Sequence, residues 1–164
     1  MSILVSDTSV IIDLERGGLL EAAFKLPYGF AVPDALYRNE MASYGGEQLL
    51  ALGLKVETLT PEELTTAARH KQARARLSVP DVYAFALAFH RGWTLLAGDG
   101  ELRNLAIAEK LAMHGVLWVL DECEKHAVMA ETQLFTGLTA IAAHPRCRLP
   151  RKDIEERFER WRGR

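Results

Sequence analysis

Ile3-Leu4-Val5-Ser6-Asp7-Thr8-Ser9 is the stretch that decides the fold, because an apolar run ends there in an acidic residue. The three consecutive apolar residues, Ile3 to Val5, favour a strand that is buried on both faces, as strands of parallel sheets are. A second run, Trp93–Ala97, is closed in a similar way by Gly98-Asp99-Gly100. Ligands of parallel sheets bind beyond the carboxyl ends of the strands, so Asp7 and Asp99 are the first functional candidates.

Strand-like and helix-like segments alternate along the rest of the chain. Two helix starts, Thr60-Pro61-Glu62-Glu63 and Ser78-Val79-Pro80-Asp81, combine a hydroxyl cap with a proline in the first turn. The alternation predicts an α/β fold of three layers, with a parallel five-stranded sheet between helices and right-handed crossovers. The predicted strands are 3–5, 28–32, 54–59, 93–97 and 116–120, and the predicted helices are 14–26, 33–44, 47–52, 60–77, 78–91, 102–114, 122–129, 132–143 and 153–162.

Composition limits the class of protein. The chain has 164 residues, 49% of them hydrophobic and 26% charged, so it can bury a continuous core, which excludes an intrinsically disordered protein. No stretch approaches the roughly 20 apolar residues that cross a bilayer, and the N-terminus lacks the basic region of a signal peptide. Two cysteines, Cys123 and Cys147, provide no disulfide framework, so we expect a cytoplasmic protein without a membrane partner.

Basic residues gather in two places, although the net charge is −2. The segment from Pro145 onward has eight basic and four acidic residues, and we expect residues 1–144 to form the domain and residues 145–164 a basic, helical tail. Both clusters suit a phosphate backbone, but solvated helix faces have the same composition, so both interpretations stay open. The second cluster consists of Arg69, His70, Lys71, Arg74 and Arg76.

The acidic residues that follow strands carry the functional hypothesis. If the strands that end at Asp7 and Asp99 are neighbours, about 4.8 Å apart, the two carboxylates enter one small volume. Two like charges at that separation repel each other unless a cation lies between them. Oxygen ligands alone favour a hard ion, Mg²⁺ or Mn²⁺, over zinc.

Each acid also has a structural interpretation. Asp7 can cap the helix that follows it, and Asp81 can complete a capping box with Ser78. Glu40 lies among polar residues, where an acid is usually solvated, and the glycines beside Asp99 can serve a turn that needs a positive φ. No single acid therefore decides the function.

Taken together, these acids and their flanking residues resemble the PIN domain family and, within it, the VapC-type toxins of toxin–antitoxin pairs. The resemblance covers about residues 2–130 and depends on spaced acids that are specific only as a set. The segments that carry it are Val5–Ser9, Leu77–Ala88, Leu95–Arg103 and His114–Glu122, with Glu40 in the helix after the second strand.

The resemblance implies a metal-dependent endoribonuclease that hydrolyses RNA phosphodiester bonds, as the toxin of a type II pair. It further implies the strand order 3-2-1-4-5, a small antitoxin protein as partner and a homodimer. The residues that would hold Mg²⁺ or Mn²⁺, and so be catalytic, are Asp7, Glu40, Asp81 and Asp99, with Ser9 and Glu101 as secondary candidates.

Other classes of site fit less well. The histidines and cysteines lack the spacing of zinc ligands, and neither common glycine-rich phosphate loop is present. An aspartyl phosphotransferase normally has a second aspartate two residues after the first, where this chain has Ser9. A response-regulator receiver needs an acidic pair near the first strand and a late lysine, and neither is evident. A catalytically silent module that binds RNA or a partner protein stays open as the alternative.

Overall fold

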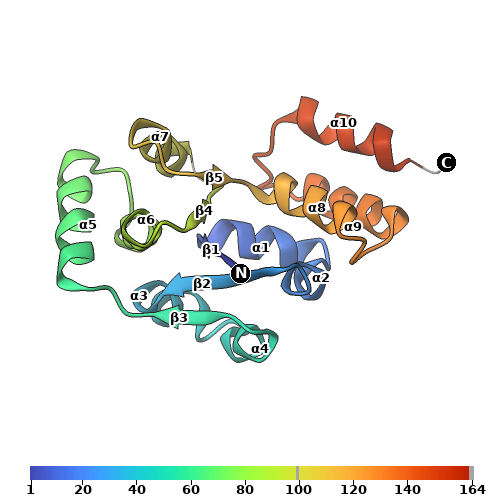
Figure 1. Cartoon of the computed structure of the whole chain (residues 1–164). Coiled ribbons are helices and arrows are strands. Elements are labelled where there is room, and N and C mark those ends of the chain that lie inside the picture. Colours follow the sequence, from blue (N-terminus) through green and yellow to red (C-terminus); the bar gives the residue numbers. More distant parts are fainter. Residues whose placement is uncertain (99, 163–164) are drawn as a thin grey trace.

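The core of the molecule is a parallel sheet of five strands in the order β3-β2-β1-β4-β5. The computed structural model (Figure 1) describes residues 1–98 and 100–162. Val5 in the central strand β1 pairs with Ala31 on one side and with Leu95 on the other. The predicted α/β fold and strand order are thereby confirmed. The strands are β1 (Ser2–Ser6), β2 (Tyr28–Pro33), β3 (Lys55–Glu57), β4 (Thr94–Leu96) and β5 (Met113–His114).

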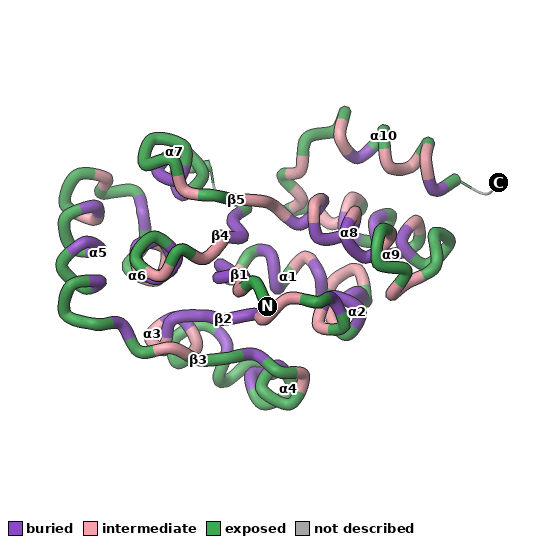
Figure 2. Tube along the Cα trace, in the orientation of Figure 1, coloured by how far each residue is buried: buried purple, intermediate pink, exposed green. Residues whose placement is uncertain are grey.

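Helices cover both faces of the sheet, because alternate strand residues face opposite sides. Leu4 and Leu96 belong to one apolar core, whereas Val5 and Leu95 belong to the other. In Figure 2 the buried residues gather on β1, β2 and β4 and on the inner sides of the helices. The second core, which contains Val5, includes residues of three helices: α5 (Pro61–Ala73), α6 (Val79–Arg91) and α7 (Gly100–Ala108). The first core, which contains Leu4, includes residues of the remaining helices: α1 (Thr8–Arg16), α2 (Leu20–Phe24), α3 (Asp34–Leu36), the π-helical turn η1 (Tyr37–Met41), α4 (Gly46–Leu52), α8 (Val116–Lys125), α9 (Glu131–Ala143) and α10 (Arg151–Trp161).

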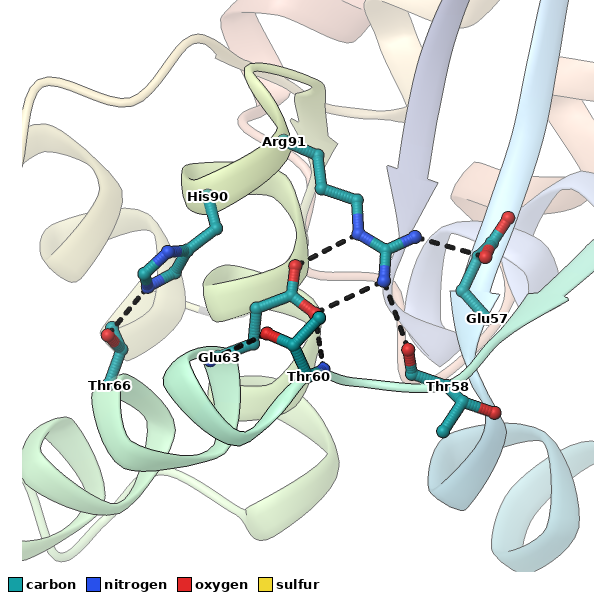
Figure 3. Close-up of polar contacts among 7 residues, drawn as sticks. All are labelled: Glu57, Thr58, Thr60, Glu63, Thr66, His90 and Arg91. Atoms are coloured by element: carbon teal, nitrogen blue, oxygen red, sulfur yellow. Dashed lines mark hydrogen bonds and ion pairs between the residues drawn. The ribbon is translucent and has the colours of Figure 1, made fainter.

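Arg91 at the end of α6 ties this helix to α5 and β3 (Figure 3). Its guanidinium donates to Glu63 at 2.9 Å, to Glu57 at 3.0 Å and to the carbonyl of Thr58 at 3.0 Å. Glu63 also closes the predicted capping box with Thr60 at the start of α5. Burial raises the pKa of Glu63, but the hydrogen bonds from Arg91 and Thr60 outweigh it and hold this pKa below its usual range.

The predicted fifth strand, 116–120, is wrong, because these residues begin α8. The fifth strand is the shorter Met113–His114, which pairs with β4. A continuous apolar run does not distinguish a buried strand from a buried helix. Here Val116, Leu120 and Cys123 are buried at helical spacing, so the run packs as one face of a helix.

Several predicted helices are shorter or divided in the structure: the segment 60–77 ends as α5 at Ala73, and the segment 33–44 becomes α3 and η1. The segment 14–26 is not one helix, since α1 begins at Thr8 and ends at Arg16, and α2 follows after Gly18. Gly18 has a φ of 66°, a conformation that interrupts a right-handed helix and that glycine adopts readily. The helix predicted for 102–114 ends at Ala108, and Lys110 then adopts a φ of 58° before β5.

The C-terminal segment packs against the body of the molecule through α10. Trp161 is 1% exposed and its indole nitrogen donates to Glu124 at 2.7 Å. Arg157 forms a bidentate pair with Asp121 at 3.0 and 2.6 Å. Among the described residues, no helix has the length and apolar composition that a bilayer span requires.

Candidate functional site

Asp7 lies where β1 ends and is fixed in place from several directions. Its backbone N–H donates to Leu96 in β4, so the ends of the two neighbouring strands are held together at 2.9 Å. Its carboxylate caps α1 by accepting from the N–H of Val10 at 3.0 Å, and it accepts from the N–H of Gly98 at 2.9 Å. The Ser9 hydroxyl lies 2.9 and 3.0 Å from its two oxygens. Asp7 is 2% exposed, so this carboxylate is both buried and held in one orientation.

Gly98 follows β4 and leaves room for the Ser9 hydroxyl, which a Cβ at this position would displace. A Cβ added to Gly98 would lie 2.5 Å from the Ser9 Oγ, well inside van der Waals contact. The φ of Gly98 is not in the left-handed region. The interpretation that a positive φ requires a glycine is therefore wrong for Gly98, and the position of the Ser9 hydroxyl explains it instead.

Glu40 reaches this edge of the sheet through Thr8. It lies in the π-helical turn η1 and is exposed, and its carboxylate accepts from the Thr8 hydroxyl. Turns of this kind are frequent at functional sites. Because Thr8 follows Asp7 directly, Glu40 is bound to the start of the helix that Asp7 caps. No local pattern in the sequence signals this contact, since it joins positions 32 residues apart.

A pocket of about 290 Å³ adjoins this contact between α1, η1 and α4. Glu40 and Thr8 lie at its border, and the exposed Tyr44 is part of its rim. Its apolar lining includes Ile11, Ile12, Leu20, Met41 and Leu49. The acidic edge of the sheet therefore opens onto a mixed polar and apolar hollow.

Asp81 lies in the first turn of α6 and is partly buried. Its backbone N–H donates to the Ser78 hydroxyl at 3.1 Å, which confirms Ser78 as the cap of this helix. Val82, the residue after Asp81, packs in the same apolar core as Val5 and Ala97. The residues that flank Asp7, Asp81 and the end of β4 thus share one core.

The remaining candidates lie after β4. Glu101 is partly buried in the first turn of α7, whereas Asp99 lies outside the described residues. The structure therefore joins Asp7 with Ser9 and Gly98, and it joins Glu40 with Thr8. Within residues 1–98 and 100–162, no three histidine, cysteine, aspartate or glutamate side chains form a group that could hold a metal ion.

Arg103 provides positive charge close to the end of β4. A Cβ added to Gly115 would lie 3.3 Å from the Arg103 Nη1 and 3.7 Å from the carbonyl of Ala97. The guanidinium of this exposed arginine therefore sits beside Gly115 and near the last residues of β4. None of the ion pairs between described residues involves Arg103.

The negative charge of Asp7 acts on Asp13, which lies in α1. Burial raises the pKa of Asp13, Arg16 opposes this rise, and the charge of Asp7 adds to it. A carboxyl further along the same helix thus experiences the field of the buried Asp7. Added positive charge near Asp7 would relieve that repulsion.

Comparison with known protein families gives a match over nearly the whole chain. A family model described as "DUF3368: PIN domain" matches residues 3–162. The match includes β1, the end of β4 and the C-terminal helix α10. Among curated proteins, none matches the chain.

Proposed function

The chain belongs to the PIN-domain family DUF3368, which has a nuclease-like fold, and from this premise we propose that it is a metal-dependent endoribonuclease. The observation that carries the proposal is the buried Asp7 carboxylate, which accepts from the N–H of Gly98 at 2.9 Å. This contact brings the acid after β1 to the residue that directly precedes Asp99. The ends of β1 and β4 therefore meet at the carboxyl edge of the sheet, where parallel sheets bind ligands.

We assign Asp7, Glu40, Asp81 and Asp99 as the residues that would hold Mg²⁺ or Mn²⁺. The donor chemistry fits, because all four supply carboxylate oxygens, which hard divalent cations prefer. The Asp7 carboxylate accepts hydrogen bonds from the neutral groups of Val10, Ser9 and Gly98, and these bonds orient it. When bound, the metal would lower the pKa of a water molecule, so that hydroxide is available near neutral pH, and it would stabilise the negative charge that develops on the phosphate.

The other residues at this edge of the sheet orient the proposed carboxylate ligands or supply positive charge for the substrate. Ser9 and the Gly98 N–H hold the Asp7 carboxylate in one rotamer, which limits the reorganisation needed at the site. Thr8 fixes Glu40 in the same way. Arg103 is placed to contact a phosphate of the substrate, and Glu101 stays a secondary candidate in the first turn of α7.

The biological setting follows from the resemblance to VapC-type toxins. We propose that the protein acts in the cytoplasm as the toxin of a type II pair, is inhibited by a small antitoxin protein and forms a homodimer. Co-expression with the product of a small neighbouring reading frame should relieve growth arrest by the protein. Growth arrest that this product leaves unchanged would contradict the toxin role and leave the nuclease proposal standing.

The decisive experiment measures cleavage of a mixed RNA pool, with single-stranded DNA in parallel. We expect cleavage with Mn²⁺ or Mg²⁺ that chelation abolishes. Asp7→Asn should lose it, whereas Glu47→Gln, which neutralises an exposed acid of α4 outside the proposed site, should retain it. Millimolar metal should raise the melting temperature of the wild type more than that of Asp7→Asn. RNA binding without metal-dependent cleavage would instead identify a catalytically silent module.

A further inference from the structure

The two basic clusters of the chain differ in how their charges are used. In the C-terminal helix, Arg157 pairs with Asp121, and Arg160 pairs with Asp121 and Glu124 at 2.5 and 3.1 Å. These arginines hold α10 on α8, and their guanidinium groups are engaged within the protein. The tail is therefore less basic toward solvent than its composition indicates.

The cluster at the end of α5 is different. Arg69 and Arg76 are exposed and Arg74 is partly buried. Within the part of the chain that the structure describes, none of these three side chains forms an ion pair with a carboxylate. No acidic residue occurs between Leu64 and Pro80. We call Arg69, Arg74 and Arg76 the arginine triad.

The backbone that carries the arginine triad is held in place by Lys71. Its ammonium donates to the carbonyl of Ala75 at 2.8 Å and to that of Leu77 at 2.6 Å. Leu77 is fully buried and its N–H donates to the carbonyl of Arg74 at 3.1 Å. The backbone of a loop fixed at this many points loses little further entropy when a ligand binds, so the ordering cost falls on the arginine side chains.

This loop leads directly into the proposed nuclease site. Leu77 is followed by Ser78, which caps α6, and Asp81 lies in the first turn of that helix. Arg76 thus precedes an acid of the proposed metal site by five residues, and Arg74 precedes it by seven. In Figure 1, α5 and α10 lie on opposite sides of the molecule, so the two basic clusters cannot serve one surface.

We propose that the arginine triad binds consecutive phosphates of a single-stranded RNA and guides it toward Asp81. The inference rests on the proposed nuclease function, because it assigns the substrate path of that site. Cationic side chains release counterions from a phosphate backbone and bind it without reading its sequence. Carboxylates repel the same backbone, so a site rich in acids needs a separate basic surface to retain an RNA.

The test compares two double variants that remove equal charge. Arg74→Ala/Arg76→Ala removes two triad arginines, and Arg146→Ala/Arg148→Ala removes two exposed arginines before α10 that also form no ion pair among the described residues. Binding of a fluorescent single-stranded RNA is measured by anisotropy in EDTA at several NaCl concentrations. Cleavage with Mn²⁺ and the melting temperature are measured on the same proteins.

We expect the triad variant to bind RNA about tenfold more weakly, with a salt slope reduced by about 1.4, as two lost phosphate contacts predict. The control variant should bind as the wild type does, and both variants should melt as the wild type does. Equal binding by the triad variant and the wild type, or an equal loss in the control, would overturn the triad proposal while Asp7-dependent cleavage survives. A wild type that binds RNA through the triad but never cleaves it would overturn only the nuclease proposal. A wild type that binds no RNA would overturn both.

Discussion

Replacement of Gly98 by alanine tests the packing of the proposed site directly. The added Cβ would lie 2.5 Å from the Ser9 Oγ and 3.5 Å from the Ser9 Cβ. The first distance is too short for any stable contact, whereas the second is an ordinary one. The Ser9 hydroxyl must therefore rotate away, and it then loses its hydrogen bond to Asp7.

The expected change in the free energy of unfolding follows from two terms. A hydrogen bond to a charged group contributes about 1.5–3 kcal/mol, and we take about 1.5 kcal/mol because Ser9 is exposed. Alanine restricts the unfolded chain relative to glycine, which returns about 0.4–1 kcal/mol where φ is not left-handed. Gly98→Ala should thus destabilise the protein by about 0.5–1.1 kcal/mol, and Ser9→Ala by about 1.5 kcal/mol.

The double variant distinguishes a clash from an unrelated loss. With Ser9→Ala present, the Oγ is absent and the alanine Cβ at position 98 fits. Gly98→Ala/Ser9→Ala should then be destabilised by only about 0.5–1.1 kcal/mol, whereas additive effects would give about 2–2.6 kcal/mol.

The assay is urea unfolding at pH 7 with a matched control. In Gly100→Ala the added Cβ meets nothing within 4 Å, so stability should not fall. An additive double variant, or a Gly98→Ala protein as stable as the wild type, would refute the proposed contact between Gly98 and Ser9.

Three further predictions concern the rest of the fold. Arg91→Met should destabilise the protein by about 2–3 kcal/mol at pH 7, because it leaves the carboxylate of Glu63 buried without its partner. The folded-state pKa of Glu63 is lowered, so the Arg91–Glu63 ion pair stabilises the protein at pH values above the ordinary glutamate pKa. The difference in unfolding free energy between wild type and Arg91→Met should therefore narrow below about pH 4.5 in urea unfolding. Asp121→Ala removes the carboxylate that pairs with two arginines of α10, and limited proteolysis should then cleave the C-terminal helix faster. Burial raises the pKa of the Cys123 thiol to about 11, so a maleimide at pH 7 should label Cys147 and leave Cys123 unmodified in the native protein.

Each of these predictions has an outcome that contradicts it. Glu57→Gln is the control for Arg91→Met, since Glu57 is 29% exposed in its side chain and its loss should matter less. An equal effect of both variants would contradict the assigned role of the Arg91–Glu63 ion pair. So would a stability difference between wild type and Arg91→Met that grows as the pH falls. Unchanged proteolysis of Asp121→Ala, or labelling of both thiols at one rate, would contradict the packing of α10 and α8.

Local signals were sufficient for much of the fold. The alternation of apolar strands and capped helices predicts a parallel sheet, and Thr60 and Ser78 cap α5 and α6 as their sequences indicate. Caps are read from a few adjacent residues, since the hydroxyl and the N–H that it accepts from are three positions apart. The place of Asp7 at the end of β1 follows from the same local pattern.

The fifth strand shows where local signals stop being sufficient. The run 116–120 is apolar throughout, and its own sequence suits either a strand or a helix. Only the packing of Val116, Leu120 and Cys123 in the first core makes it a helix. Gly98 was likewise ambiguous, because a glycine needed for a positive φ and one needed for a close approach look the same in a sequence.

By itself, the sequence determined the class of fold, the order of most elements and the candidate acids, because backbone propensity and capping act over a few residues. Tertiary structure alone decided that Thr8 holds Glu40 and that Gly98 makes room for Ser9 beside Asp7. It also decided that Arg157 is engaged by Asp121, whereas Arg74 and Arg76 form no ion pair among the described residues. The physical reason is common to all of them: a hydrogen bond, a steric contact or an ion pair depends on distance in space, which the chain establishes only when remote segments pack.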